Sequence, residues 1–400
     1  MKKFSKIIAL LLCLSLVAAF AACAGNTTEE TTAAPSADET TEAAATDFSE
    51  SGEYTAENTK YVIGATGPLT GDAASYGISV QQGATIAVNE INANGGLNGV
   101  EFAFEMKDDQ ATAEAASTGY DALFEAGMQV SLCSVTSGSA ESFATRADED
   151  GVFSLTPSGS SDKVINASSY AFRVCFGDPD QGVLAAEELT GKYEKIGAIY
   201  DSSDAYSTGI YEAFKAKMAE LNVEYVEQSF DAENNRDFST QVEALADCDV
   251  IFLPIYYTEA GLIAKACVAK GCDAVLFGCD GLDGVAAQID ETVTNSISYI
   301  TPFDAKSEAE NVKNFVAAYE EAYGATPDQF AADAYDAVYA IYEAMEALGV
   351  NNVTVAPNVL GDALVAKFTS EDFSFSGLTG VMTWDESGAS TKVPVIVTLQ

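Results

Sequence analysis

Along this chain the pattern of hydrophobic and polar positions alternates between short apolar runs, typical of buried strands, and the longer one-sided pattern of a helix. Short apolar runs such as Tyr61–Thr66 have the length of buried strands, whereas stretches such as Ile78–Ala93 place apolar side chains near one face of a helix. Alternating strands and helices predict a mostly parallel sheet with covering helices. In the first half we expect strands at 61–66, 100–106, 128–135 and 152–156 and helices at 78–93, 112–125 and 139–150.

The same pattern then begins again. We expect strands at 195–200, 223–230, 249–255, 274–278 and 296–302, with helices at 207–221, 237–246 and 258–270. Helices at 307–323, 327–348 and 356–368 follow, and then strands near 380–384 and 393–398. Two α/β units of similar plan predict two doubly wound lobes, and the helices that belong to neither repeat predict that the chain crosses between the lobes.

Composition narrows the classes of function. The 400 residues are enough for two to three structural units, and 48% hydrophobic with 20% charged residues is ordinary for a globular protein. The 61 acidic against 19 basic residues give a net charge of −42, which argues against a nucleic-acid partner and against a basic lipid-binding patch. The absence of histidine excludes Ser-His-Asp and Cys-His nucleophile systems and His-containing zinc sites. We therefore expect no enzyme and no cofactor.

The N-terminus has the features of a secretory signal peptide at 1–22. Three lysines in Met1–Lys6 precede an apolar run from Ile7 to Phe20, which is shorter than the roughly 18 residues of a spanning helix. The small residues before Cys23 resemble the bacterial lipobox, in which the cysteine is diacylated and becomes the mature N-terminus. The alternative is a plain signal peptide with an incidental cysteine.

Residues 23–58 are expected to form a flexible acidic tether behind that lipidated cysteine. They are rich in Thr, Ala, Glu, Ser and Asp, with Pro35 as their one proline, so they cannot bury enough apolar surface to fold. Repulsion between the acidic side chains extends such a segment. A tether on a lipid places the folded part at the extracytoplasmic face of the bacterial cell membrane.

Six cysteines remain after Cys13 and Cys23, and no two of them form a C-x-x-C pair. Most lie in apolar runs, so buried free thiols are the leading interpretation, with disulfides second and a structural zinc site third. They are Cys133, Cys175, Cys248, Cys267, Cys272 and Cys279.

An ordered set of short segments from Tyr61 to the C-terminus resembles the Leu/Ile/Val-binding proteins, the substrate-binding components of branched-chain amino acid ABC transporters. The segments are Gly64–Gly71, Tyr76-Gly77, Asn89–Gly99, Asp108-Asp109, Gly151-Val152, Thr156-Pro157, Asp180–Gly182 and Thr383–Gly388.

The resemblance implies a type I periplasmic-binding-protein fold, α/β in class, with two doubly wound lobes joined by three crossovers. It also implies a monomer that closes on a small amino acid ligand and works with permease subunits. We expect the first lobe at 59–177 and 302–378, the second lobe at 178–301, and C-terminal strands of the second lobe at 379–400.

The resemblance also assigns ligand-binding roles to seven residues. Ser137 would hold the ligand's carboxylate, Ser160 would add a second hydroxyl, and Asp280 would meet the ammonium group. The family usually has glutamate at this last position, one methylene longer. Ser158 would contact the ligand through its backbone. The aromatic positions are Tyr76 in the first lobe and Tyr206 and Tyr256 in the second.

The same positions make sense from the residues themselves. Each lies at or just past the end of a predicted strand, where ligands bind in doubly wound folds. The loop at Ser137 leads directly into a helix, whose N-terminal N–H groups and dipole attract a carboxylate. Asp280 leaves a buried strand, and in a closed cleft its carboxylate needs a cationic partner such as an ammonium group. The alternatives are N-cap serines, a solvated turn aspartate, and tyrosines used in packing.

Other motifs point to no further chemistry. Gly64-x-x-Gly67 lacks the third glycine of a dinucleotide fingerprint, and Asp108-Asp109 is more typical of a strand-terminal turn than of a cation site. The acidic stretch 231–237 lacks the glycine and terminal glutamate of a calcium loop, so we expect no metal. The tyrosines of 335–342 predict a helix packing face.

The leading hypothesis is an extracytoplasmic substrate-binding lipoprotein of an ABC transporter, which captures a small aliphatic or branched-chain amino acid for import. Another ligand in the same fold remains open: an amide, an aromatic acid or a short peptide. A sensor that reports ligand occupancy to a membrane receptor is the alternative from another class.

Overall fold

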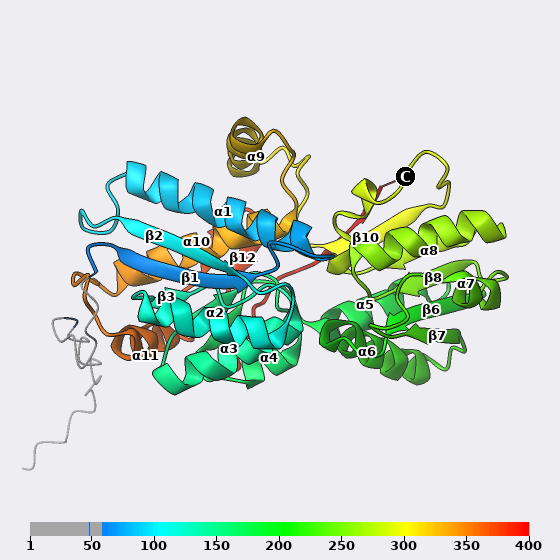
Figure 1. Ribbon diagram of the computed structural model, residues 1–400, viewed down its shortest axis with the longest axis horizontal. Helices are drawn as coiled ribbons and strands as arrows, with labels where there is room; N and C mark the ends of the chain where they lie inside the picture. The colour runs from blue at the N-terminus through cyan, green and yellow to red at the C-terminus, as the bar shows by residue number, and fades with distance from the viewer. Residues whose placement is uncertain (1–47, 49–57, 400) are drawn as a thin grey trace, which may run out of the picture. The chain divides into compact units, whose positions relative to one another are not determined.

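The computed structural model describes residues 48 and 58–399, in which helices alternate with mostly parallel strands (Figure 1). The predicted signal peptide, Cys23 and almost all of the predicted tether lie outside the described residues. In the part that is described, each helix is either too short or too polar to cross a bilayer.

The first lobe contains a parallel sheet of five strands in the order β2-β1-β3-β4-β5. Strand β1 is buried at every position except Val62, as expected for a strand covered on both faces. Helices α1, α2, α3, α10 and α11 contact these strands. The bounds are β1 (Tyr61–Gly67), α1 (Ala74–Ala93), β2 (Phe102–Asp108), α2 (Ala113–Glu125), β3 (Val130–Ser131), α3 (Ser137–Asp150), β4 (Ser154–Thr156), α4 (Asp162–Asn166) and β5 (Ala171–Arg173).

The second lobe contains a sheet of six strands in the order β13-β10-β9-β8-β6-β7. All neighbours are parallel except β13, which runs antiparallel to β10. Its elements are α5 (Asp178–Leu189), β6 (Ile196–Asp201), α6 (Ala205–Leu221), β7 (Val226–Phe230), α7 (Ser239–Ala244), β8 (Val250–Leu253), α8 (Tyr257–Lys270), β9 (Val275–Gly278), the 3-10 turns η1 (Asp280–Leu282) and η2 (Val285–Ala287), β10 (Ile297–Thr301) and β13 (Val395–Thr398).

The chain passes between the two lobes three times: after β5, after β10 and before β13. The second passage leads into α9 (Glu310–Tyr323), α10 (Gln329–Ala347) and α11 (Pro357–Phe368). Helix α10 lies along α1 in the first lobe (Figure 1). The predicted architecture of two doubly wound lobes with three crossovers is therefore present.

One glycine sets how closely α1 and α10 approach. A Cβ atom on Gly83 would lie 2.0 Å from the carbonyl oxygen of Ala331, so no side chain fits at this position. The contact holds α10 against α1 and thereby fixes where the side chains of α10 point.

The C-terminal segment differs from the expected assignment. Strand β12 (Gly380–Met382) pairs with β11 (Phe375–Gly377), which contacts α10, and not with the sheet of the second lobe. Trp384 also stays with the first lobe, because its ring packs on Phe368 and its Nε1 donates to the carbonyl of Arg173 at 2.8 Å. The third passage therefore comes after Trp384, later than the expected boundary at residue 379.

Two other sequence expectations are met within the described residues. The six cysteines are free thiols, five of them buried and Cys248 half-buried. Asp108 ends β2, and its carboxylate accepts from the amides of Leu69 and Gln110, which is the strand-terminal turn that the sequence predicted.

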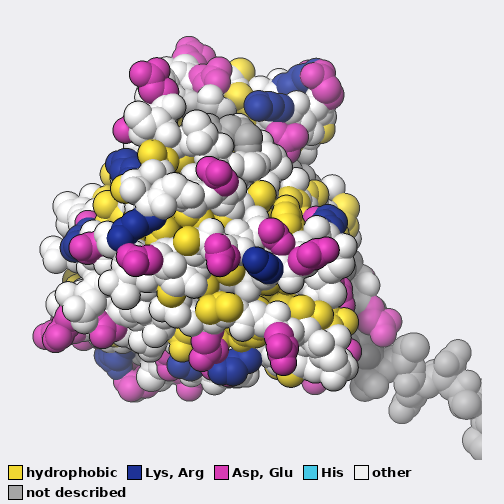
Figure 2. Space-filling view, turned by 90° about the vertical axis from the view of Figure 1, so that its right-hand side faces the viewer, with side chains coloured by type: hydrophobic (Ala, Val, Ile, Leu, Met, Phe, Trp, Pro, Cys, Tyr) yellow, Lys and Arg dark blue, Asp and Glu magenta, His cyan; other side chains and the backbone are white. Residues whose placement is uncertain are grey.

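Acidic side chains are spread over the molecular face shown in Figure 2, with hydrophobic patches between them. Most ion pairs among the described residues include at least one exposed side chain, and such pairs contribute little to stability. The pair between Lys392 and Asp333 is an exception, because the two side chains are only 0% and 3% exposed.

Candidate functional site

Six of the seven predicted ligand-binding residues line one cavity between the two lobes. They are joined there by residues that the sequence did not single out, among them Thr136 and Phe330. The cavity volume is about 10 Å³, which is room for about one water molecule. Its walls are Tyr76, Val135, Thr136, Ser137, Ser158, Tyr206, Tyr256, Asp280, Gly281 and Phe330.

Tyr76 joins the two lobes at this cavity. It lies in the first turn of α1, and its hydroxyl donates to the carbonyl of Gly281 in the second lobe at 2.5 Å. The same hydroxyl accepts from the amide of Tyr257 at 3.1 Å. Its ring packs on Phe330 with a centroid distance of 4.4 Å. Tyr76 therefore closes the cavity and contacts both halves of the cleft.

The second lobe contributes an aromatic wall. Tyr206 follows β6 and Tyr256 follows β8, and their rings stack with centroids 5.0 Å apart and planes 10° from parallel. The hydroxyl of Tyr256 is buried without a hydrogen-bond partner. Burial raises the pKa of both phenols, so both stay neutral. The wall presents flat apolar faces together with an unsatisfied hydroxyl.

Asp280 places a buried carboxylate in the cavity. It follows β9 and is 4% exposed, and its Oδ1 accepts from the hydroxyl of Tyr206 at 2.7 Å. Its own amide donates to Gln181 Oε1 at 3.0 Å. Burial raises the pKa of Asp280 to about 6, and the hydroxyl of Tyr206 and the amide of Gly281 lower it less than burial raises it. The carboxylate is thus held by neutral donors, and no Lys or Arg among the described residues lies at the distance of an ion pair from it.

The hydroxyl side of the cavity is built at the start of α3. Ser137 is the first residue of that helix, and its Oγ accepts from the amide of Ser161 at 3.2 Å. Thr136 is the N-cap, and its Oγ1 is buried without a partner. Ser158 donates from its Oγ to the carbonyl of Val135 at 3.0 Å. The helix terminus, Thr136 and Ser137 together form a surface suited to an anion.

Ser160 is placed differently from the prediction. It is fully buried but does not line the cavity. Its carbonyl accepts from the amide of Asp178 at 3.0 Å and from Arg173 Nη1 at 2.9 Å, so its backbone is held toward the start of α5. Its Oγ has no hydrogen-bond partner. The neighbours of Ser160 therefore turn it away from the cavity wall.

Asp178 is the second buried acid of this region, and the sequence analysis gave it no role. It is 1% exposed, and neither carboxylate oxygen has a hydrogen-bond partner. Burial raises its pKa well above the usual range, and the charge of Asp280 raises it further. The adjacent Asp180-Gln181-Gly182 segment was the signal that could have pointed to it. Phe330 offered no such signal, because it comes from α10, far along the chain.

Metal ions in proteins are commonly held by groups of Cys, His, Asp or Glu side chains. No group of three or more Cys, Asp or Glu side chains among the described residues is arranged to hold a metal ion. The buried acids instead meet hydroxyls, amides and single cations. Binding of a small polar molecule is what this arrangement can do chemically.

Comparisons with known proteins identify the family to which the chain belongs. The family model described as "Periplasmic binding protein" matches residues 60–395. The Leu/Ile/Val-binding protein BraC3 of Rhizobium johnstonii is 30% identical over 55% of this chain, and the matched part spans 61% of that relative, less than two thirds of its length. Leu/Ile/Val-binding protein homolog 3 of Brucella melitensis is 26% identical over 82% of this chain and 87% of that relative.

Solved structures share the fold. The branched-chain amino acid transporter substrate binding protein of Streptococcus pneumoniae, solved with isoleucine, superposes with a TM-score of 0.72 at 26% identity and covers 85% of this chain and 99% of that chain. A solute binding protein from R. palustris, solved with benzoate, has a TM-score of 0.75 at 20% identity over 85% of this chain and 93% of that chain, which shows the fold alone. The chain therefore belongs to the periplasmic binding protein family, with a type I fold and with Leu/Ile/Val-binding proteins among its relatives.

Proposed function

We propose that this protein is the substrate-binding component of an ABC transporter and captures a small aliphatic amino acid between its lobes. The observation that carries the proposal is the cavity in which a buried carboxylate, Asp280, faces a helix N-terminus at Ser137. A zwitterion carries both complementary charges on one molecule. Relatives named for leucine, isoleucine and valine support the choice of ligand class.

The ligand's carboxylate is assigned to the start of α3. The first N–H groups of a helix have no partners within the helix, and its dipole adds a positive potential at this end. Ser137 and the unpartnered Oγ1 of Thr136 add neutral donors. An anion is favoured there without any need for a lysine or arginine.

The ligand's ammonium group is assigned to Asp280. A buried carboxylate is costly unless it is paired, and the partners of Asp280 are neutral. An ammonium group would complete the pair. This argument favours an amino acid over the aromatic acid that the R. palustris neighbour holds, because benzoate brings a second negative charge and no cation.

Ligand entry requires the lobes to separate. The cavity of about 10 Å³ is much smaller than the 300–1,000 Å³ of typical ligand pockets. The hydrogen bonds of Tyr76 to Gly281 and Tyr257 cross between the lobes, so opening must break them. We infer a hinged cycle of opening and closure around the three crossovers.

The cellular location belongs to the same proposal. The signal peptide and the Cys23 motif would place the folded part outside the cytoplasmic membrane on a lipid anchor, next to permease subunits. Mass spectrometry of the mature N-terminus tests this, with a diacylated Cys23 expected. The Cys23→Ala variant should leave the membrane fraction, and a variant that stays there contradicts the anchor.

Thermal shift and calorimetry with matched ligands test the binding function. Leucine, isoleucine and valine should raise the melting temperature, because binding to the folded state alone stabilises it. Isopentylamine lacks the carboxylate and 4-methylpentanoate lacks the ammonium group, so both should bind far more weakly. If no amino acid binds, or if benzoate and 4-methylpentanoate bind as tightly as leucine, the proposal fails.

Transport and sensing are separated by uptake. A strain without the protein should lose uptake of the amino acid that the calorimetry identifies. Unchanged uptake with altered signalling would assign the protein to a membrane receptor instead.

A further inference from the structure

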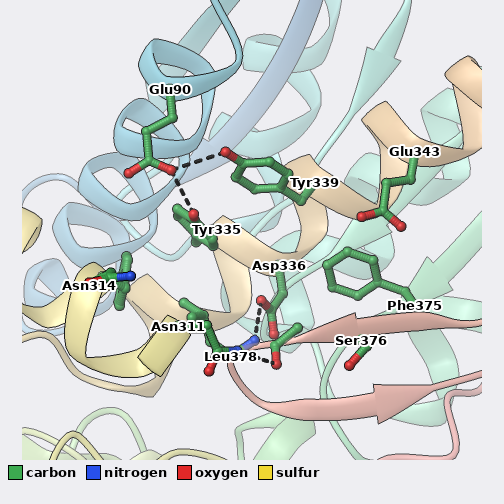
Figure 3. A pocket seen from close by; sticks show the side chains of 12 residues that line it. Glu90, Asn311, Asn314, Tyr335, Asp336, Tyr339, Glu343, Phe375, Ser376 and Leu378 are labelled. Atoms are coloured by element: carbon green, nitrogen blue, oxygen red, sulfur yellow. Dashed lines mark hydrogen bonds between the residues drawn. The ribbon is translucent and has the colours of Figure 1, made fainter. Parts of the chain in front are cut away.

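A second cavity, of about 440 Å³, lies within the first lobe between α1, α9, α10 and β11 (Figure 3). We call it the α10 pocket, because Tyr335, Asp336, Tyr339 and Glu343 of that helix line it. It shares no lining residue with the cleft cavity, where α10 contributes Phe330. One helix therefore serves two separate cavities.

Aromatic rings form a large part of the wall of the α10 pocket. Phe315 from α9 packs on Tyr335 with a centroid distance of 4.9 Å, and Tyr335 lies 4.8 Å from Tyr339 on the next turn of α10. Phe375 of β11 contributes a further ring, near Glu343 (Figure 3). Aromatic faces carry negative electrostatic potential and attract cations.

Three carboxylates share these walls, and none of the described residues that line the pocket is a lysine or an arginine. Glu90 accepts from the hydroxyls of Tyr335 at 2.6 Å and Tyr339 at 3.0 Å, as the dashed lines in Figure 3 show. Glu343 makes no hydrogen bond or ion pair with any residue that the structure describes, and its pKa is raised by partial burial and by the charge of Glu346. The side chains that line the pocket therefore provide no positive charge to balance these carboxylates.

The floor of the pocket is preformed around the third carboxylate, that of Asp336. This side chain is fully buried and accepts from the amides of Leu378 at 2.8 Å and Thr379 at 2.9 Å. A Cβ atom on Gly377 would lie 2.3 Å from the Asp336 carboxyl carbon, so only glycine lets β11 pass there. Lys392, whose charge lowers the pKa of Asp336, is bonded to Asp333 and does not line the pocket.

We propose that the α10 pocket binds a small organic cation of the aliphatic diamine class, with one ammonium group at Glu90, the other at Glu343, and its methylenes on the aromatic rings. The volume lies within the range of small-molecule sites. An anion would meet the carboxylates with like charge, and a neutral ligand would gain no ionic attraction from them. This site is independent of amino acid capture in the cleft.

Calorimetry with 1,5-diaminopentane at physiological ionic strength tests the proposal. The protein should carry Asp280→Asn, so that the carboxylate assigned to an ammonium group in the cleft is neutral. We expect saturable binding of one diamine per chain and none of 1,5-pentanediol, which has a similar length but no charge. Equal binding of the diol, or no saturable binding of the diamine, overturns the proposal.

Two charge-matched variants locate the site. Glu343→Gln should weaken diamine binding about fivefold, because it removes an exposed charged partner. Glu346→Gln removes the same charge from the same helix but lies outside the pocket lining, so it should change the affinity less than about twofold. Equal weakening by both variants would mean general attraction to an acidic surface and would overturn the site. Glu343 is exposed, so its substitution leaves the fold intact.

Discussion

The cleft and the α10 pocket are both built from carboxylates and tyrosines, yet they differ in burial. In the cleft Asp280 is 4% exposed beside a cavity of about 10 Å³, whereas Glu343 is exposed beside a cavity of about 440 Å³. Water solvates Glu343 whether or not a ligand is present. The carboxylate of Asp280 has only neutral protein donors.

This difference teaches where selectivity can arise. A carboxylate removed from water must be neutralised by a partner in a defined geometry, so a ligand that lacks the partner is penalised. A carboxylate at the edge of water attracts many cations and discriminates weakly between them. We therefore expect the cleft to be selective and the α10 pocket to be permissive toward amines of different length.

The largest expected effect is on the cleft. Asp280→Asn should weaken amino acid binding by more than about a thousandfold, because it leaves a buried ammonium group without its anion. The matched variant Glu343→Gln should leave amino acid affinity unchanged. Calorimetry with the amino acid that binds tightest to the wild type measures both, and a loss of less than tenfold in Asp280→Asn contradicts the ammonium assignment.

A buried carboxylate with its own cation provides the next comparison. Asp333 is paired with Lys392 inside the first lobe, so Lys392→Met should lower the free energy of unfolding by about 3–5 kcal/mol. The exposed pair of Lys313 and Glu308 is the control, where Lys313→Met should cost less than about 1 kcal/mol. Urea denaturation at pH 7 measures both variants. If both variants lower the free energy of unfolding by the same amount, burial does not determine how much these ion pairs contribute to stability.

The pH dependence of binding sharpens the contrast. Burial raises the pKa of Asp280 to about 6, and the ammonium group of a ligand requires the ionised form. Affinity should be constant above pH 7 and fall by about tenfold per pH unit below 6, because binding must then displace a proton. Calorimetry at pH 5 and 7.5 measures this, and equal affinity at both values would show that Asp280 does not contact the ammonium group.

The smallest effect concerns stability. Burial raises the pKa of five acids to about 6 or 7, so the folded chain holds protons that the unfolded chain releases. Between about pH 4 and 7 stability should therefore rise as pH falls, and the net charge of −42 acts in the same direction. The acids are Asp204, Asp280 and Asp336 at about 6 and Glu259 and Asp328 at about 7.

Thermal unfolding without ligand measures this dependence. The melting temperature should be a few degrees higher at pH 5 than at pH 7.5. A lower value at pH 5 would mean that these carboxyls are not protonated more readily in the folded chain than in the unfolded one.

Much of the fold was predictable because segments with a regular hydrophobic period indicate their own secondary structure. The helix expected at 78–93 is observed at Ala74–Ala93, and the strand expected at 296–302 is observed at Ile297–Thr301. The prediction missed the short strand Ala171–Arg173 and the helix Asp178–Leu189. The strand has only three residues, and in the helix a proline near the start and four acidic side chains obscure the apolar face.

The candidate site was predictable to the same extent and for a related reason. Residues that follow the parallel strands of each sheet gather at one edge of that sheet. Ser137 follows a strand of the first lobe and Asp280 a strand of the second, and the two meet because the lobes close on one cavity. Ser160 satisfies that rule in sequence but is turned away by the bonds of its carbonyl to Asp178 and Arg173. That these residues bind a ligand stays a prediction.

The order and type of the elements, the acidic character and the strand-end residues of the cleft were determined by the sequence itself, because each depends on neighbours in the chain. Only the tertiary structure decided that Phe330 completes the cleft, that Asp178 is buried without partners, and that α9, α10 and β11 enclose a second cavity. These features depend on contacts between residues far apart in sequence, such as Gly83 with Ala331. No local pattern encodes such contacts, since they are set by how side chains pack in three dimensions.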